Sequence, residues 1–113
     1  MELTCHCKNI HFTLEAPKQI TSCNCSICRR YSPLWAYYDP NVVKVTIGKY
    51  GVDTYVWGDK EVEFVRCAHC DCITHYQTFE EDPEPRIAVN FRMAEEELVS
   101  GIDVRYFNGK ALL

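Results

Sequence analysis

Two stretches, Cys67-Ala68-His69-Cys70 and Cys5-His6-Cys7, are expected to decide how this chain folds. An extended C-x-C segment places both side chains on one face of a strand, and a tight turn at C-x-x-C brings both sulfurs to one point. Together they offer four thiolates, the ligand set of a closed tetrahedral zinc site. Such a metal can supply on the order of 10–16 kcal/mol of apparent folding free energy. We therefore predict a structural metal ion that joins the start of the chain to its middle.

A second cluster is Cys23-Asn24-Cys25-Ser26-Ile27-Cys28, which offers three more thiolates. Three protein ligands leave a fourth position on a zinc ion for water or substrate. A soft, thiolate-rich ion favours an incoming thiol over hydrolysis, so Cys23, Cys25 and Cys28 are candidate catalytic residues. The alternative is a second closed site, whose fourth ligand would be one of four residues: Cys72, His6, His69 or His75. We expect two Zn²⁺ per chain, one structural and the other catalytic if its fourth position is open.

The cysteine content also fits a disulfide framework, because the 113 residues include eight cysteines. The spacings C-x-C and C-x-x-C suit convergence on one ion better than mutual disulfides, and no secretion signal is recognisable after Met1. Metal binding is typical of reducing compartments. We therefore expect zinc ligation and a cytoplasmic location, and the length predicts a single domain over residues 1–113.

Charge and hydropathy argue against two classes of partner. The formal net charge is −4, and Arg29-Arg30 is the only basic cluster, whereas nucleic-acid binding needs clustered Lys and Arg. No apolar run approaches the roughly 20 residues that a membrane span needs. We therefore expect neither nucleic acid nor a membrane as a partner, and the sequence makes no prediction of oligomeric state.

Apolar residues mostly recur with a period of two, which indicates a mainly β fold. The predicted strands cover residues 10–14, 43–47, 53–57, 61–66, 72–79, 87–91 and 102–107. Gly58-Asp59-Lys60 reads as the turn of a hairpin. Short helical turns are expected only at 25–30 and 93–99.

Four further side chains are candidates for the chemistry. Arg29 and Arg30 could hold an anionic ligand beside the metal, or pair with the thiolates and nearby carboxylates. His75 could act as an acid, a base or a group that orients the thiol, or simply be a packed histidine. Cys72 reads as a small buried residue near the metal or as a ligand that closes the second site.

The cysteine motifs in this order resemble the signatures of the glutathione-dependent formaldehyde-activating enzyme family, which includes centromere protein V. The resemblance extends through Tyr55-Val56-Trp57-Gly58, Cys72-Ile73-Thr74-His75-Tyr76, Ile87-Ala88-Val89-Asn90-Phe91-Arg92 and Phe107-Asn108-Gly109. Two departures are Lys8-Asn9 after the first C-x-C and Asp71 after the C-x-x-C, where the family usually has glycine. Asp71 is expected in the left-handed backbone region, which Asp tolerates better than most residues.

The resemblance implies several coiled antiparallel sheets organised around zinc-binding cysteine knuckles. It implies a closed zinc site at four cysteines and a second zinc at three: Cys5, Cys7, Cys67 and Cys70, then Cys23, Cys25 and Cys28. The family's named activity joins glutathione to formaldehyde, giving S-hydroxymethylglutathione, and is classed as carbon–sulfur lyase chemistry.

We therefore predict a small zinc-dependent carbon–sulfur lyase-like enzyme that acts on a thiol adduct, with glutathione as the candidate thiol. The second zinc would bind the substrate sulfur, and Arg29 or Arg30 would hold a substrate carboxylate. His75 or Tyr76 would move the proton. The alternative is a non-catalytic, zinc-stabilised module that binds a protein partner.

Overall fold

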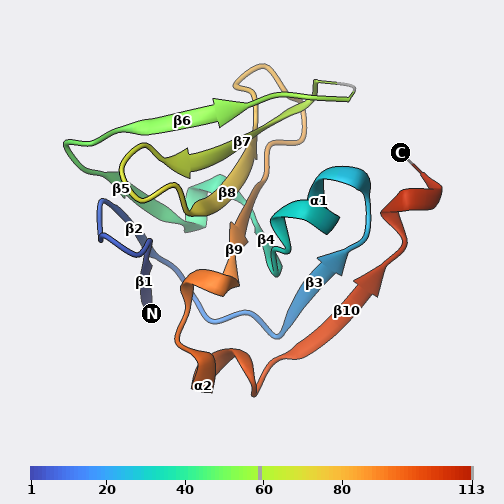
Figure 1. Cartoon of the computed structure of the whole chain (residues 1–113), viewed down its shortest axis with the longest axis horizontal. Coiled ribbons are helices and arrows are strands. Elements are labelled where there is room, and N and C mark those ends of the chain that lie inside the picture. The colour runs from blue at the N-terminus through green and yellow to red at the C-terminus, as the bar shows by residue number, and fades with distance from the viewer. Residues whose placement is uncertain (59, 113) are drawn as a thin grey trace.

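Two β-sheets form the architecture of the computed structural model, which describes residues 1–58 and 60–112 (Figure 1). The small sheet contains, in order, β1 (Glu2–Thr4), β2 (Ile10–Thr13) and β5 (Lys44–Ile47). The large sheet contains, in order, β10 (Asp103–Phe107), β3 (Gln19–Cys23), β4 (Trp35–Tyr38), β9 (Ile87–Asn90), β8 (Ile73–Thr78), β7 (Val62–Cys67) and β6 (Val52–Tyr55). The predicted mainly β fold is therefore confirmed.

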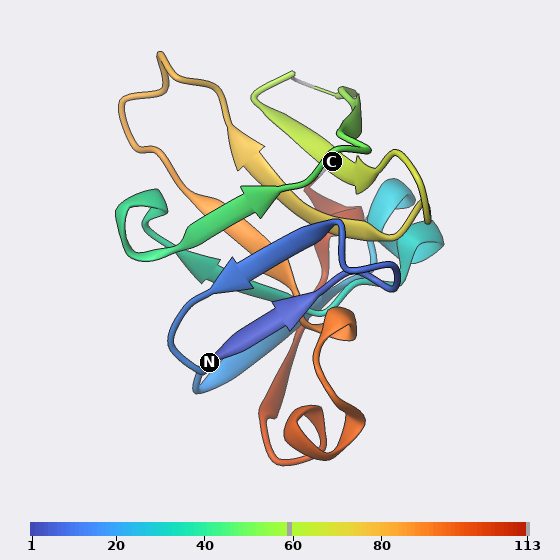
Figure 2. The ribbon, with the colours of Figure 1, turned by 90° about the vertical axis from the view of Figure 1, so that its left-hand side faces the viewer.

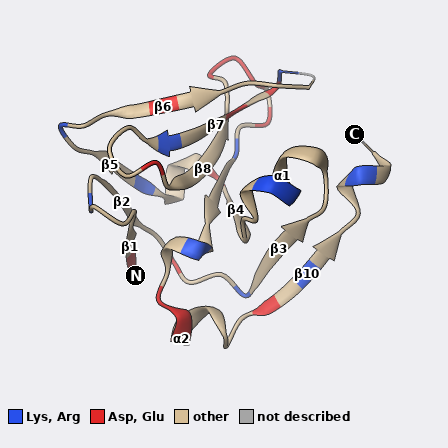
Figure 3. Cartoon of the chain, in the orientation of Figure 1, with Lys and Arg blue, Asp and Glu red and all other residues tan. Residues whose placement is uncertain are grey.

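The helical segments are short. They are α1 (Ser26–Tyr31), α2 (Glu96–Val99) and three turns of 3₁₀ helix, η1 (Pro40–Val42), η2 (Phe91–Met93) and η3 (Gly109–Ala111). No helix in the described part of the chain has the length and apolar character needed to cross a membrane. Acidic side chains gather on α2 and in the loop between β8 and β9, whereas α1 is basic (Figure 3).

The predicted strands are present, with ends displaced by one or two residues. Three strands were missed, β1, β3 and β4, because they are short or lack a clean alternation of polar and apolar residues. The hairpin turn is flanked by Gly58 and Lys60, both with positive φ, while Asp59 lies outside the described residues.

One strand pair departs from the expected antiparallel arrangement. β10 pairs in parallel with β3, in the register Arg105 with Thr21 and Phe107 with Cys23, while the other strand pairs are antiparallel. Figure 1 shows the two strands running side by side in the same direction at one edge of the large sheet. This pairing brings the last strand of the chain beside the first cysteine of the three-cysteine cluster.

Apolar residues form two cores, one on each face of the large sheet. The first lies between the two sheets, which face each other in Figure 2, and includes Phe12, Ile20 and Phe91. The second lies beneath α1 and is made of Cys25, Cys28, Trp35, Phe64, Tyr76 and Ala88. Because side chains alternate along a strand, β8 sends His75 into the first core against Phe12 and Tyr76 into the second.

Candidate metal centres

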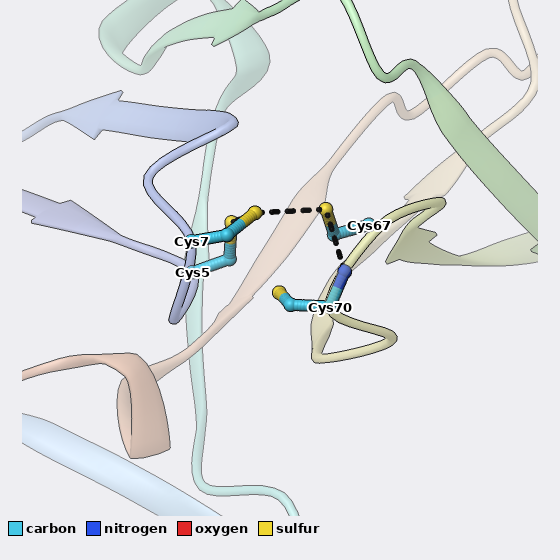
Figure 4. Close-up of side chains that lie close together, drawn as sticks. All are labelled: Cys5, Cys7, Cys67 and Cys70. Carbon is cyan, nitrogen blue, oxygen red and sulfur yellow. Dashed lines mark hydrogen bonds between the residues drawn. The ribbon is translucent and has the colours of Figure 1, made fainter.

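Four cysteines converge where the turn between β1 and β2 meets the turn between β7 and β8 (Figure 4). The Sγ atoms of Cys5 and Cys7 are 3.8 Å apart, and those of Cys7 and Cys67 are 3.6 Å apart. All four sulfurs, including that of Cys70, lie within 4.8 Å of one another. A tetrahedral zinc ion with Zn–S bonds of roughly 2.3 Å separates its sulfurs by roughly 3.8 Å. The four-sulfur group therefore fits a single metal ion.

The first C-x-C segment reaches this geometry by a turn and not by the extended strand that we expected. The amide of Lys8 donates to the carbonyl of Cys5 at 3.0 Å, and Lys8 has φ of 68°. Asp71 has φ of 63° after the C-x-x-C, as expected from its position. Both residues stand where the left-handed conformation makes glycine the easier choice, so this chain tolerates local strain at both knuckles.

Nitrogen donors surround the sulfurs of this group. Cys67 Sγ accepts from the amides of His69 at 3.4 Å and Cys70 at 3.5 Å, and from Asn9 Nδ2 at 3.4 Å. Burial raises the pKa of the Cys70 thiol, but hydrogen bonds from the amides of Cys72 and Cys7 and from neighbouring thiols outweigh it, so the pKa falls to about 6. Metals bind the thiolate and not the thiol. Hydrogen bonds also lower the pKa of Cys67, whereas burial raises the pKa of Cys7 to about 12, so Cys67 and Cys70 are the members of the group that ionise first.

The second cluster is built from the end of β3 and the start of α1. Cys23 ends the strand, Cys25 precedes the helix and Cys28 lies within it, and their sulfurs are within 4.8 Å of one another. The amide of Cys25 donates to Cys23 Sγ at 3.5 Å, and Trp35 Nε1 donates to Cys28 Sγ at 3.4 Å. These three sulfurs could also hold one metal ion.

The three thiols differ in their ease of ionisation. Burial raises the pKa of Cys23 and of Cys28. Burial acts on Cys25 in the same direction, but hydrogen bonds from the amides of Cys28 and Ile27 and from the neighbouring thiols lower its pKa overall. Cys25 is therefore the first of the three expected to present a thiolate.

None of the four residues considered as a closing ligand lies with the three-cysteine cluster. Cys72 interacts with Cys70, Cys5 and the amide of His6, beside the four-sulfur group. The ring of His69 stacks on Tyr50 with centroids 4.0 Å apart. Within residues 1–58 and 60–112, no His, Cys, Asp or Glu joins the three sulfurs as a fourth ligand. The described residues therefore supply three candidate ligands to this cluster, and not four.

Residues 108–110, which follow β10, cover one side of the three-cysteine cluster. A Cβ atom added to Gly109 would lie 2.5 Å from Cys23 Sγ and 3.2 Å from Cys25 Cβ. Asn24 fixes the segment, since its Nδ2 donates to Asn108 Oδ1 at 3.0 Å and its Oδ1 accepts from the amide of Lys110 at 2.9 Å. Asn108 and Gly109 entered the sequence analysis only as part of the family resemblance, so this contact was missed.

An aromatic wall lines the same face of the large sheet. Trp35 lies edge-on to Tyr76 with centroids 4.9 Å apart, and Tyr76 approaches Phe64 at 5.4 Å and Tyr37 at 6.4 Å. Burial raises the pKa of both Tyr37 and Tyr76. They are therefore neutral hydroxyl groups at physiological pH, able to donate or pass on a proton.

The two arginines predicted to hold a ligand face away from the sulfurs. Cys28 is the buried residue of α1, and Arg29 and Arg30 follow it on the exposed side of the helix. Arg30 Nη1 donates to the carbonyl of Ser26 at 2.7 Å. Their role in ligand binding stays a prediction that this geometry does not favour.

His75 lies on the opposite face of the large sheet from the three-cysteine cluster. It is 2% exposed, its Nδ1 is 2.8 Å from Thr74 Oγ1 and its ring packs edge-on against Phe12. Its predicted role as acid or base stays untested, and the structure places Tyr76 and not His75 with the three sulfurs.

The burial of His75 predicts a pH-dependent stability. Burial lowers its pKa from 6.5 to about 4, so below pH 6.5 the unfolded chain binds a proton that the native chain does not. Stability is complete above that pH and falls as the pH drops towards 4. We expect His75 to lower the free energy of unfolding by about 2 kcal/mol between pH 7.5 and pH 5.0.

Urea unfolding of the wild type and of His75→Asn, both with excess zinc, would measure this contribution. Metal loss affects both proteins alike, so the difference between their pH dependences isolates the imidazole. If the free energy of unfolding depends on pH in the same way in both proteins, the prediction is contradicted.

Comparison of the sequence with known protein families identifies the family of this chain. The sequence profile of the glutathione-dependent formaldehyde-activating enzyme (GFA) family matches residues 1–103. The chain belongs to the GFA family. This confirms the resemblance seen in the cysteine motifs.

A solved structure shares the GFA fold of this chain. It is the crystal structure of a Rhodobacter sphaeroides protein, with a TM-score of 0.73 and 23% sequence identity, covering 93% of this chain and 100% of the other. At this identity the likeness concerns the fold alone. No curated protein gives a significant match.

Proposed function

We propose that this GFA-family protein is a zinc-dependent enzyme that makes or breaks the carbon–sulfur bond of a thiol adduct, with glutathione as the thiol. The observation that carries the proposal is the three-cysteine cluster, which lacks a fourth protein ligand within the described residues. The four-sulfur group would hold the structural zinc. The family description adds glutathione and formaldehyde as the candidate substrates.

A zinc ion held by Cys23, Cys25 and Cys28 would bind the substrate sulfur and stabilise it as a thiolate. In the addition direction, the thiol loses its proton and a sulfur electron pair forms a bond to the aldehyde carbon. The π electron pair of the carbonyl moves to its oxygen, which takes up a proton. The cleavage direction reverses these steps.

The side chains of the aromatic wall would transfer a proton to or from the substrate and exclude water from the site. Trp35 donates to Cys28 Sγ and so fixes that sulfur. Tyr37 is 43% exposed and its ring packs against that of Tyr76, so this pair reaches from solvent to the second core. We assign the proton transfer at the substrate oxygen to this pair of hydroxyls, in preference to His75.

The proposal is tested by calorimetric titration of reduced, zinc-loaded protein with glutathione and with S-methylglutathione. We expect saturable binding of glutathione that is weakened at least tenfold by methylation, because a thioether cannot supply a thiolate. X-ray absorption at the zinc edge, averaged over the two sites, should show sulfur ligands with a minority of oxygen and no imidazole scattering.

The alternative is a module that uses both metals only for stability and binds a protein partner. It predicts saturated shells of four sulfurs, or three sulfurs and one nitrogen, at both metals. Equal, weak affinity for glutathione and S-methylglutathione together with such shells would favour the module over the enzyme.

A further inference from the structure

Strand β10 carries an arginine onto the face that holds the three-cysteine cluster. Arg105 pairs with Thr21 and Phe107 pairs with Cys23 in parallel register. Arg105 Nε donates to Thr21 Oγ1 at 3.3 Å, and its guanidinium carbon lies 5.1 Å from the centroid of the Phe107 ring. The ring of Phe107 in turn borders Gly109, which contacts Cys23. With a strand rise of roughly 3.3 Å per residue and a strand spacing of roughly 4.8 Å, the Cα atoms of Arg105 and Cys23 are about 8 Å apart.

A second arginine approaches the same face from the other side. The guanidinium carbon of Arg86 lies 6.0 Å from the centroid of the Tyr37 ring. Burial raises the pKa of Tyr37, while the charges of Arg105 and Arg86 lower it and that of Cys23 raises it. Tyr37 therefore stands among both arginines and the first sulfur of the three-cysteine cluster.

The positive charge of these two arginines is not neutralised in the part of the chain that the structure describes. The ion pairs there join His11 to Glu2, and Arg66 to Asp53 and Asp71. Arg105 is nevertheless held in place by a hydroxyl and an aromatic ring, which leaves the terminal nitrogens of its guanidinium group for a ligand. A held guanidinium fork matches the geometry of a carboxylate.

We propose that Arg105, assisted by Arg86, is the carboxylate-binding subsite of the thiol site. The inference rests on the proposed function and specifies its substrate class. The preferred thiols carry a carboxylate several bonds from the sulfur, as a peptide thiol does, and small uncharged thiols are bound without this contribution. Arg105 lies beyond residue 103, where the match to the GFA family ends, so this subsite is argued from the chain's own last strand.

The experiment compares three probes on zinc-loaded wild type and Arg105→Gln by calorimetry. Glutathione offers sulfur and carboxylates, 2-mercaptoethanol offers sulfur alone, and S-methylglutathione offers carboxylates with the sulfur blocked. We expect Arg105→Gln to weaken the binding of glutathione at least tenfold and to leave the affinity for 2-mercaptoethanol unchanged. Arg105→Lys should restore part of the affinity, and Arg86→Gln should cause a smaller loss than Arg105→Gln.

The control variant is Lys44→Gln, which removes one positive charge from the exposed surface of β5 in the small sheet. It should bind all three probes as the wild type does. The rival variant is Arg29→Gln with Arg30→Gln, which tests the arginines on α1. Loss of glutathione affinity in that double variant, with none in Arg105→Gln, would overturn the subsite and place the carboxylate over α1.

The probes separate failure of the subsite from failure of the proposed function. If 2-mercaptoethanol and glutathione bind the wild type but Arg105→Gln changes neither, the subsite is wrong and the thiol site stands. If 2-mercaptoethanol does not bind the wild type, the thiol site fails. The subsite is then supported if S-methylglutathione binds the wild type more tightly than Arg105→Gln, and overturned if it does not.

Discussion

Replacement of Cys67 by serine is expected to abolish the cooperatively folded state at ordinary temperatures. Cys67 is fully buried, belongs to the four-sulfur group and accepts hydrogen bonds from two amides and from Asn9. A metal held by four thiolates contributes on the order of 10–16 kcal/mol of apparent folding free energy, as much as the whole stability of a typical domain. Thermal melting followed by circular dichroism, with zinc content measured in parallel, would show the loss.

The matched control is Cys72→Ser, which alters a thiol beside the four-sulfur group that is not among its four ligands. It should keep both zinc ions and melt within a few degrees of the wild type. A Cys67→Ser protein that has lost one zinc ion yet melts like the wild type would contradict a structural role for the four-sulfur group.

Gly109→Ala is expected to remove the second metal and leave the first. The added Cβ would lie 2.5 Å from Cys23 Sγ, closer than side-chain carbons approach sulfur, and Asn24 prevents the segment from moving away. We expect zinc content to fall from two ions to one per chain and glutathione affinity to fall at least tenfold. The four-sulfur group is untouched, so the melting temperature should change little.

Zinc analysis and the glutathione titration would measure both effects. Gly101→Ala is the matched control, because the nearest atom to its added Cβ is the carbonyl oxygen of Leu98 at 3.6 Å, an ordinary contact. Two zinc ions and unchanged glutathione affinity in Gly109→Ala would contradict the role of this segment in shaping the site.

The cysteine spacings predicted both sulfur groups because metal ligation depends on residue type and short spacing, which the sequence displays directly. The strands were predictable where side chains alternate between core and solvent, as in β2. β3 and β4 were not predicted because both contain consecutive buried residues, which hide the period of two.

The surroundings of the three-cysteine cluster could not be predicted, because they depend on which strands are neighbours. Nothing local in the sequence of Arg105 or Gly109 indicates that β10 pairs in parallel with β3. For the same reason the sequence could not show that Arg29 and Arg30 lie on the exposed side of α1, since closeness in sequence to Cys28 does not place a side chain on the same face of a helix. Nor could the sequence show that Tyr76 lies on the face of β8 with the three sulfurs while His75 lies on the opposite face.

The parallel pairing of β10 with β3 also sets an order of events during synthesis on the ribosome. The four ligands of the first group have all emerged once Cys70 leaves the exit tunnel, so that metal can be captured while the rest of the chain is still being made. The three-cysteine cluster emerges earlier but gains its cover only after Phe107 and Gly109 have been synthesised. At elongation rates of about 5–20 residues per second, its sulfurs stay uncovered for several seconds, during which a reducing environment protects them from oxidation.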